Sequence, residues 1–193
     1  PELILIKDLE RTSAWRVFST YLDYPHSDNV AKNILILNSS GAATDETTAF
    51  NTTVPTASVF SVGSSTSTNP SGEDVIAWCF HSVEGYSKVG SYAGNSNTDG
   101  SFIYCGFKPA YVMLKTADGS GHWNIIDNKR DTYNPESDYI YANSTDVNTP
   151  SPVADFVSNG FKLRLNDSYW NDSSYDYLYI AFASHPFKTS NAR

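Results

Sequence analysis

The chain nearly repeats itself, and this near-repetition limits the folds open to it more than any other feature. Five blocks recur in the same order while the loops between them change length: Pro1–Lys7 in Pro109–Lys115, Trp15 in Trp123, 34–39 in 139–144, 59–63 in 156–160, and 76–81 in 180–185. A duplicated β-unit of this kind is typical of a display architecture more often than of an enzyme. We therefore predict two repeated units, 1–85 and 86–193, which pack as separate domains or as one sandwich.

The apolar segments are short, rich in β-branched or aromatic residues, and bounded by turn residues, which is the pattern of β-strands. Residues 14–22 come nearest to a helical pattern, but their repeat partner alternates like a strand, so we predict a strand there too. Asn159-Gly160 predicts a tight turn with positive φ. The expected strands are 3–7, 15–19, 34–38, 57–63, 74–82, 88–93, 101–106, 111–116, 123–127, 139–143, 153–157, 161–165 and 177–184. The sequence therefore predicts an all-β, antiparallel β-sandwich of the jelly-roll or concanavalin-like kind.

The second unit begins with two strands, 88–93 and 101–106, that lead into Pro109, and nothing comparable precedes Pro1. If the true unit begins near Tyr86, the first unit lacks its opening strands. We expect the full protein to extend further toward its N-terminus and to supply those strands from there.

Aromatic residues at matching places in the two units are expected to form core. This applies to Trp15 with Trp123, and to Trp78 with Phe182. Large rings that recur at one place in a duplicated pattern more often fill a core than bind a ligand.

The composition argues against several classes of function. The formal net charge of −8 argues against binding nucleic acid through its phosphates, because such binding needs a basic face. No apolar run approaches the roughly 20 residues of a membrane span, so we expect no membrane insertion. Cys79 and Cys105 are too few for a disulfide framework, and the sequence leaves open whether they pair. With 14% aromatic and only 18% charged residues, the chain suits an extracellular protein that contacts sugars or surfaces.

The sequence holds no recognisable catalytic or cofactor motif. It contains no Gly-x-Ser-x-Gly elbow, phosphate loop or His-Glu-x-x-His. The densest acidic group is Asp127, Asp131, Glu136 and Asp138. Glycoside hydrolysis needs two carboxylates across a cleft, and a chain with 21 acidic residues always offers some pair. We expect no catalytic residue, no cofactor and no enzymatic activity.

One loop is similar to the start of a calcium-binding loop, with Asn95, Asn97 and Asp99 at alternate positions before Gly100. The twelfth position should be a bidentate Glu but is Gly106, and the flanks are strands. We expect a tight hairpin loop, with calcium bound in another geometry as the alternative. The four histidines are expected at the surface or at strand ends, without a metal: His26, His81, His122 and His185.

Exposed aromatic residues among Asn and Asp are the candidate ligand-binding residues. Trp170 has no counterpart in the first unit and lies with Tyr169 and Tyr175 in a polar stretch that we expect to form an exposed loop. Such rings stack on a sugar, make a subunit contact, or pack locally. Tyr133 and Arg130, in the mixed-charge loop 129–136, form part of a binding rim or belong to an internal salt-bridge network.

Several motifs together resemble a known family. They are 90–95 (GSYAGN), Asp99-Gly100, 106–109 (GFKP), 156–162 (FVSNGFK), 179–183 (YIAFA), 186–188 (PFK) and 72–80 (GEDVIAWCF). Over nearly its whole length the chain resembles an uncharacterised domain of tail-fibre-like or appendage structural proteins of marine bacteriophages, often found beside concanavalin-like lectin domains. The resemblance implies a place on the virion surface, outside cells, with other virion proteins as partners. It carries no catalytic or ligand residues to this chain.

We therefore expect a non-enzymatic virion structural domain, of a tail fibre or a head decoration, that attaches to a host surface or glycan. Homo-oligomers are expected because appendages gain avidity from several copies. One alternative is a purely structural assembly module of a virion or surface appendage. Another is a polysaccharide-degrading enzyme of the tailspike type. A shallow aromatic patch favours binding, a deep acidic cleft favours hydrolysis, and a large self-complementary patch favours assembly.

Overall fold

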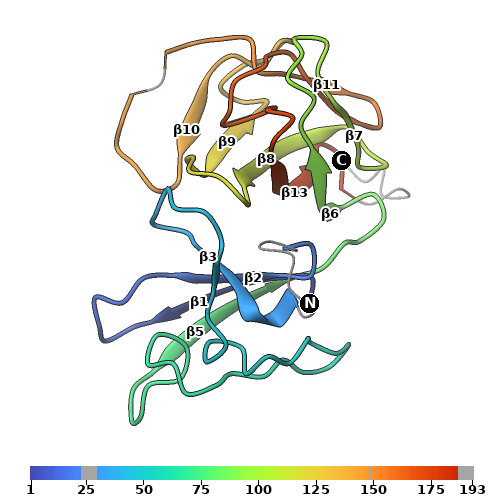
Figure 1. The fold of residues 1–193 in the computed structure, drawn as a ribbon. Helices are drawn as coiled ribbons and strands as arrows, with labels where there is room; N and C mark the ends of the chain where they lie inside the picture. The colour runs from blue at the N-terminus through green and yellow to red at the C-terminus, as the bar shows by residue number, and fades with distance from the viewer. Residues whose placement is uncertain (23–29, 148, 187–193) are drawn as a thin grey trace. The chain divides into compact units, whose positions relative to one another are not determined.

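The structure is a computed structural model that describes residues 1–22, 30–147 and 149–186 (Figure 1). These residues form antiparallel β-strands and one short 3-10 turn, η1 (Val30–Lys32), which confirms the expected all-β class. No helix in these ranges is long and apolar enough to cross a membrane. The strands are β1 (Leu3–Asp8), β2 (Arg16–Ser19), β3 (Asn33–Ile36), β4 (Thr44–Asp45), β5 (Val75–Phe80), β6 (Ser87–Ala93), β7 (Phe102–Tyr104), β8 (Pro109–Thr116), β9 (Asn124–Asp127), β10 (Tyr139–Tyr141), β11 (Ala154–Val157), β12 (Gly160–Leu163) and β13 (Asp176–Ala183).

The chain divides into two compact units. One consists of residues 1–81 with 117–120, and the other of residues 82–116 with the described residues from 121 onward. This division follows compactness and not sequence similarity, so the repeat ranges 1–85 and 86–193 stay a prediction.

The first unit is built on one five-stranded sheet, in the order β4-β3-β2-β1-β5. Ile4 and Ile6 of β1, Phe18 of β2 and Ile34 of β3 project from one face because strand residues alternate between faces. Loop residues close over this face, and the Phe50 ring lies 5.3 Å from the Phe18 ring, centroid to centroid. Alternation along the strands and burial under a loop therefore produce this core.

The second unit is a β-sandwich. A five-stranded sheet, β10-β9-β8-β13-β6, faces a three-stranded sheet, β11-β12-β7. Their shared core contains Val112 and Leu114 from the larger sheet and Phe156 and Phe161 from the smaller one, all at most 2% exposed. The predicted sandwich architecture is thus present in this unit.

The two larger sheets place corresponding strands in the same order. β3-β2-β1-β5 in the first unit corresponds to β10-β9-β8-β13 in the second. Leu3 lies opposite Ser19, and Tyr111 lies opposite Asp127, so β1 with β2 and β8 with β9 pair in the same register. This agreement supports the predicted duplication, which remains our interpretation.

The last repeated block aligns differently in the structure and in the sequence. The sequence comparison matches Ile76 with Ile180, but Ile76 pairs with Lys7 and the residue that pairs with Lys115 is Leu178. The structural match is shifted by two residues because an alternating strand pattern matches itself again after two residues, with every side chain on the same face. Trp78 therefore corresponds to Ile180 and not to Phe182, and the proposed match of His81 with His185 is lost.

Two strand expectations were wrong. Residues 57–63 form no strand: the Thr56 N–H bonds to the Val59 carbonyl at 2.8 Å in a local turn. Their alternation is explained by packing, since Phe60 and Val62 rest on the core of the first unit.

The segments before and after residues 94–100 do not form a hairpin, because β6 and β7 belong to different sheets. The remaining expected strands are present, most of them shorter than expected.

The matched tryptophans are only partly core. Trp123 is 1% exposed and buried as expected. Trp15 is half-buried and stacks on Trp78 with ring centroids 5.0 Å apart, while Trp78 itself is 46% exposed. The expectation of a core position was therefore wrong for Trp78, which lies on the outermost strand of its sheet and has little above it.

Candidate functional site

An exposed pair of aromatic rings lies on the smaller sheet of the second unit. β7 is an edge strand whose only described partner is β12. Ile103 at its centre is buried, so alternation turns Phe102 and Tyr104 to the outside, where they are 48% and 64% exposed. Two large rings on one side of a short strand make an apolar surface, and such a surface favours contact with a ligand or partner.

The neighbouring strands complete this surface. Lys162 lies opposite Phe102, and Gly160 lies opposite Tyr104. We call the outward-facing residues of this sheet the aromatic face: Phe102, Tyr104, Asp155, Val157, Gly160 and Lys162. Glycine is required at 160 because an added Cβ would lie 2.0 Å from the Ile103 carbonyl oxygen. Because Gly160 has no side chain, no neighbour on β12 projects beside the Tyr104 ring.

The backbone after β7 fixes the position of Tyr104. The Asn159 carbonyl accepts bonds from the N–H groups of Cys105 at 2.9 Å and Gly106 at 3.1 Å. Gly106 has a φ of 81°, a conformation that glycine adopts without strain. A Cβ at Gly106 would lie 3.6 Å from the Tyr104 hydroxyl oxygen, so the ring runs close to this backbone. The end of the strand that carries Tyr104 is therefore anchored.

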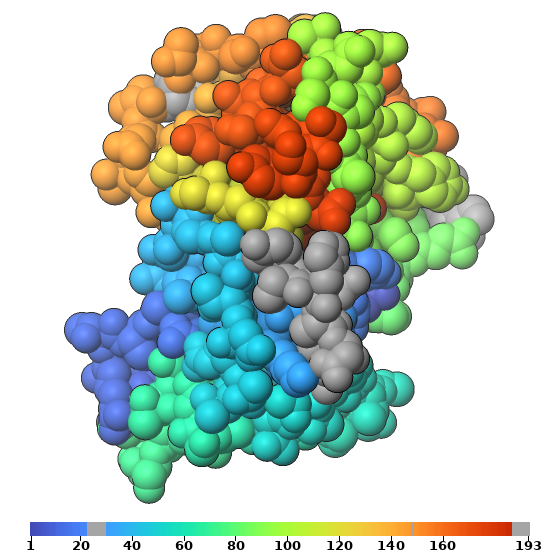
Figure 2. Space-filling view, viewed as in Figure 1, coloured from blue at the N-terminus to red at the C-terminus, as the bar shows by residue number. Residues whose placement is uncertain are grey.

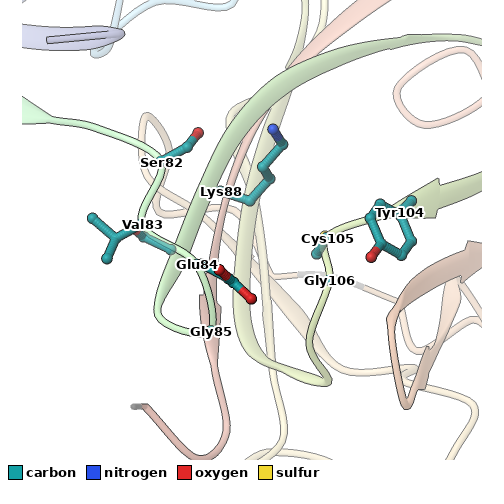
Figure 3. A pocket seen from close by; sticks show the side chains of 9 residues that line it. Ser82, Val83, Glu84, Gly85, Lys88, Tyr104, Cys105 and Gly106 are labelled. Atoms are coloured by element: carbon teal, nitrogen blue, oxygen red, sulfur yellow. The ribbon is translucent and has the colours of Figure 1, made fainter. Parts of the chain in front are cut away.

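A pocket of about 360 Å³ opens beside Tyr104 (Figure 3). It lies between β6 and β7, the edge strands of the two sheets. Its lining is Ser82, Val83, Glu84, Gly85, Ser87, Lys88, Tyr104, Cys105 and Gly106. Tyr104 belongs to both the pocket and the aromatic face, so a bound molecule could contact both. In the space-filling view, the segment around β7 lies at the surface of its unit (Figure 2).

A tight turn presents the acidic group of this pocket. The Tyr86 N–H bonds to the Val83 carbonyl at 2.9 Å, and Gly85 supplies the positive φ of 71° that the third position of such a turn needs. Glu84 therefore stands at the tip of the turn, and Lys88 follows on β6 (Figure 3). One carboxylate and one ammonium give the pocket hydrogen-bonding capacity without a strong net charge.

The thiol in this pocket is not a nucleophile. Burial raises the pKa of the Cys105 thiol to about 12, although a hydrogen bond with Tyr179 and the charge of Lys88 act in the opposite direction. The thiol therefore stays protonated at neutral pH, and a thiol reacts as a nucleophile only as the thiolate. The groups that line the pocket are suited to hydrogen bonding and apolar contact.

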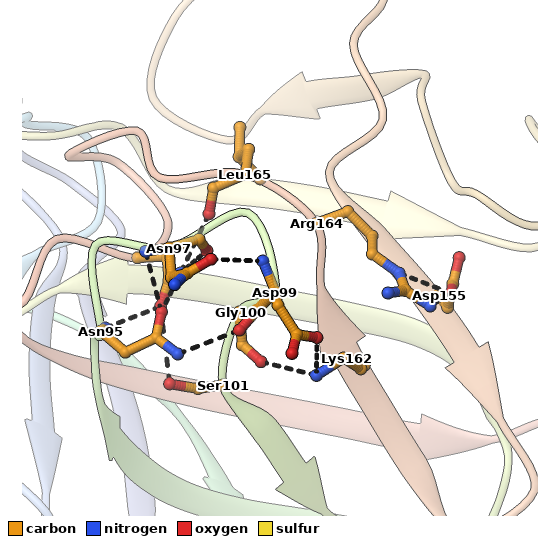
Figure 4. A network of polar contacts seen from close by, with 10 residues as sticks. Asn95, Asn97, Asp99, Gly100, Ser101, Asp155, Lys162, Arg164 and Leu165 are labelled. Carbon is orange, nitrogen blue, oxygen red and sulfur yellow. Dashed lines mark hydrogen bonds and ion pairs between the residues drawn. The ribbon is translucent and has the colours of Figure 1, made fainter.

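A buried asparagine holds the loop between β6 and β7, whose residues Asn95, Asn97 and Asp99 are labelled in Figure 4. Asn171 is fully buried, and its side-chain nitrogen donates to Asn95 Oδ1 at 2.7 Å, to the Asn97 carbonyl at 2.9 Å and to the Leu165 carbonyl at 3.0 Å. Its Oδ1 accepts the Asn95 N–H at 3.0 Å. Asn171 therefore ties the loop between β6 and β7 to the connection that precedes β13.

The same contacts oppose the calcium reading of the loop. Asn95 Oδ1 and Asn97 Oδ1 accept the backbone N–H groups of Asn97 and Asp99, so the candidate ligand oxygens are already bonded within the loop. The Asp99 carboxylate pairs with Lys162 at 2.8 Å. Within the described ranges, no group of three or more His, Cys, Asp or Glu residues could hold a metal ion. His26 lies outside the described residues.

Trp170 is not an exposed platform. It is 2% exposed and packs against Tyr139 with ring centroids 5.2 Å apart. The Tyr92 hydroxyl donates to the Trp170 carbonyl at 2.8 Å. The expectation of an exposed loop fails here because the adjacent polar residue, Asn171, satisfies its amide inside the protein and draws the tryptophan into the core.

The two predicted tyrosines beside Trp170 are partly covered. Tyr169 is 37% exposed and meets the His122 ring edge-on, with centroids 5.7 Å apart. Tyr175 is half-buried and packs against the core of the second unit. They retain some exposed ring surface but do not form a flat platform with Trp170.

Tyr133 and Arg130 lie in an exposed loop, as expected. Tyr133 is 85% exposed, the highest value among the tyrosines that the structure describes, and Arg130 pairs with Asp127 at 2.9 Å. Within the described chain, neither residue forms a hydrogen bond, ion pair or ring contact with Tyr169, Trp170 or Tyr175, so the five predicted residues are not joined into one site.

The acidic group around Glu136 does not form an open cleft. The Glu136 side chain is 2% exposed, and its Oε2 atom has no hydrogen-bond partner. Asp131 Oδ2 is engaged by the backbone N–H groups of Ser137 at 2.5 Å and Asp138 at 2.6 Å. A substrate could not reach Glu136 without a rearrangement of this loop.

Cys79 and Cys105 are both free thiols.

Sequence reasoning missed Phe102 and Tyr104, although a signal was present. Phe102-Ile103-Tyr104-Cys105 places two aromatic residues on one side of a strand and two smaller apolar residues on the other. All four are apolar enough for a core, so the sequence does not reveal which side faces outward. The outward side is decided by the position of β7 as an edge strand.

Comparisons with known proteins add a family and no further relatives. A search of curated proteins and a search of solved structures find no match. A family described as a domain of unknown function, DUF7483, matches residues 1–186. The match spans the first unit and the described part of the second, including every residue of the aromatic face and its pocket. The chain therefore belongs to the DUF7483 family.

Proposed function

We propose that this protein is a non-catalytic binding module that attaches to neutral glycans through the aromatic face and the adjacent pocket. The observation that carries the proposal is the exposure of Phe102 and Tyr104 on one side of an anchored strand, at 48% and 64%. The apolar C–H side of a sugar ring packs well on the electron-rich face of an aromatic ring. Hydroxyl groups of the same sugar are then within reach of polar groups at the edge.

The charges near the face favour a neutral ligand. Lys162 pairs with Asp99 at 2.8 Å, and Arg164 forms an ion pair with Asp155 (Figure 4). Paired charges largely cancel each other at a distance, so the face has no strong field to attract an acidic polymer. Binding should therefore change little when the NaCl concentration rises from about 50 mM to about 500 mM.

A glycan array followed by calorimetry with the best ligand tests this proposal. We expect Tyr104→Ala to weaken binding at least tenfold, because the stacking surface is removed. Tyr104→Phe should bind like the wild type, because it keeps the ring. These substitutions should change stability little, since exposed positions on an edge strand contribute little packing.

Tyr133→Ala is the matched control, because Tyr133 is an exposed tyrosine outside the aromatic face. We expect it to bind normally. Loss of binding in Tyr133→Ala with normal binding in Tyr104→Ala would transfer the site to the loop 129–136. An array without any binding would contradict the proposal.

The wider biological role that we propose rests on the resemblance to phage appendage proteins. In that role, the module lies on a virion surface, outside cells, as part of a tail fibre or head decoration, and meets a host glycan. Several copies on one appendage would raise the avidity of weak individual sites. A role in degrading polysaccharide finds no support at Glu136, whose carboxyl group is covered. A role in assembly is favoured by the outer edge of β5, a strand that pairs with β1 alone among the described strands.

A further inference from the structure

The outer edge of β5 in the first unit is an open sheet edge. β5 pairs with β1 and with no other strand of the described chain. The Leu9 N–H bonds to the Asp74 carbonyl at 3.0 Å. This bond continues the hydrogen-bond ladder between β1 and β5, and it shows which residues of β5 direct their backbone groups toward β1. Backbone groups point alternately to the two sides of a strand, so those of Val75, Ala77 and Cys79 point to the open edge.

The side chains of β5 are unusually exposed for their place in the fold. Trp78 is 46% exposed and Val75 is 42% exposed. Their equivalents in β13, by pairing with β1 and β8, are Ile180 and Tyr177, which are 3% and 0% exposed. An edge strand with free backbone groups and apolar side chains is a template for another strand.

The second unit shows how such an edge is covered. There, β6 pairs antiparallel with β13 along its whole length, from Ala93 opposite Asp176 to Ser87 opposite Phe182. β13 holds the place in its sheet that β5 holds in the first unit. No described residue of the first unit takes the place of β6.

The side chains at the open edge also define what would fit there. In the second unit, the large Tyr179 ring lies across Gly90, where an added Cβ would be 2.8 Å from the Tyr179 hydroxyl oxygen. The residue of β5 equivalent to Tyr179 is Ala77, since Leu114 pairs with one and Ile6 with the other. A small residue on β5 leaves room for a large one opposite it.

We propose that the first unit binds an extended segment of another polypeptide as an additional antiparallel strand on the outer edge of β5, with a bulky apolar side chain opposite Ala77. Backbone hydrogen bonds to Val75, Ala77 and Cys79 supply the pairing, as in other complexes formed by strand addition. The added strand would cover the apolar side chains of β5, as β6 covers those of β13.

Synthetic peptides of residues 86–95, which contain β6, provide the probe. The whole 193-residue chain is labelled with ¹⁵N and titrated with the natural peptide and with its Gly90→Phe version. We expect the Gly90→Phe peptide to bind at least tenfold more tightly and to shift the amide signals of Val75, Ala77 and Cys79. The bulky residue fills the space over Ala77, which glycine would leave empty.

Two backbone changes separate strand addition from adhesion to exposed apolar side chains. In the proposed pairing, the Lys88 N–H of the peptide faces β5 and the Val89 N–H faces away. N-methylation at Lys88 should abolish binding, and N-methylation at Val89 should not. In the protein, Ala77→Pro removes an N–H that faces the open edge but leaves every hydrogen bond between β5 and β1 intact. The variant should therefore fold and should not bind the peptide.

Three results would overturn the proposal. The first is the absence of binding by either peptide. The second is an equal effect of the two N-methyl groups, because strand pairing distinguishes them. The third is a dimer of the chain in light scattering that Ala77→Pro dissociates, because the edge would then be occupied by a second copy of β5.

Discussion

At the scale of single residues, Glu136 is a carboxylic acid enclosed by the fold. Its side chain is 2% exposed, and one carboxyl oxygen has no hydrogen-bond partner. Burial, with the negative charges of Asp131, Asp127 and Asp155, raises its pKa to about 7, and the charge of Lys108 acts in the opposite direction. The folded protein therefore holds a proton on this group that the unfolded chain releases near pH 4.5.

This raised pKa predicts a pH dependence of stability. A group with a pKa raised by folding contributes stability that is present below its unfolded pKa and is lost as the pH rises through the folded pKa. Between about pH 4.5 and pH 7, the wild type should lose up to about 3 kcal/mol relative to Glu136→Gln, which mimics the protonated acid. Urea unfolding of both proteins at pH 5 and pH 8 measures this difference. Parallel pH profiles would show that Glu136 titrates normally.

Asn171 holds the loop between β6 and β7 through several hydrogen bonds. Asn171→Ala removes several hydrogen bonds at a fully buried position and leaves the Asn95 N–H without its acceptor. We expect a loss of about 3 kcal/mol in the free energy of unfolding. Asn166→Ala, an exposed asparagine on the same connection, is the control and should change stability by less than about 0.5 kcal/mol. Equal effects would show that Asn171 does not hold the loop.

At the scale of secondary-structure elements, Gly160 is a critical contact between β12 and β7. A Cβ at this position would lie 2.0 Å from the Ile103 carbonyl oxygen, and a backbone atom cannot move aside cheaply. Gly160→Ala should therefore destabilise the protein by about 3 kcal/mol and displace β7, which weakens glycan binding as well. Gly72→Ala is the control: nothing lies within 4 Å of its added Cβ, and the only cost there is its φ of 74°, a strain that Gly160 does not have. If Gly160→Ala binds glycan normally, β7 does not position the site.

Most strands could be predicted from the sequence because each buries one alternating set of apolar side chains. Alternation does not specify the partner of a strand, and for this reason β6 and β7 were expected to pair with each other. It also cannot separate strand pairing from packing, as residues 57–63 show. The positive φ expected at Asn159-Gly160 is absent from both residues. Glycine is needed at 160 because the backbone of β7 approaches it closely, and not because of the geometry of the turn.

The candidate site was harder to predict than the fold. Polar neighbours suggested that Trp170 is exposed, but the polarity of Asn171 is satisfied inside the protein. Exposure of Phe102 and Tyr104 follows from their place on an edge strand, which depends on how distant segments pair. Local composition shows neither where a polar side chain finds its hydrogen-bond partners nor which distant segments pair. The exposed loop with Tyr133 was predictable because its charges and its proline are incompatible with a core.

At the scale of the whole molecule, the two units use the same capping bond. The Asn38 Oδ1 atom accepts the Trp15 N–H at 3.0 Å, and the Asn143 Oδ1 atom accepts the Trp123 N–H at 2.9 Å. Asn38 follows β3 and Asn143 follows β10, and these two strands hold corresponding places in the two larger sheets. The predicted duplication gives these two bonds the same role.

The matched bonds give a prediction about both units. Asn38→Ala and Asn143→Ala should each lower the free energy of unfolding by about 1 kcal/mol, because each leaves the backbone N–H of a tryptophan without its acceptor. Chemical unfolding of the two variants, followed by tryptophan fluorescence, measures both effects. A large effect in one variant and none in the other would mean that the two bonds are not equivalent.

The aromatic face is the central claim about function, and its most direct test is an NMR titration of the ¹⁵N-labelled chain with the best glycan from the array. We predict that the amide signals of Phe102, Tyr104, Gly160 and Lys162 shift most, with smaller changes along 82–88. Largest shifts in the loop 129–136, or in the first unit, would place the ligand elsewhere and contradict the account.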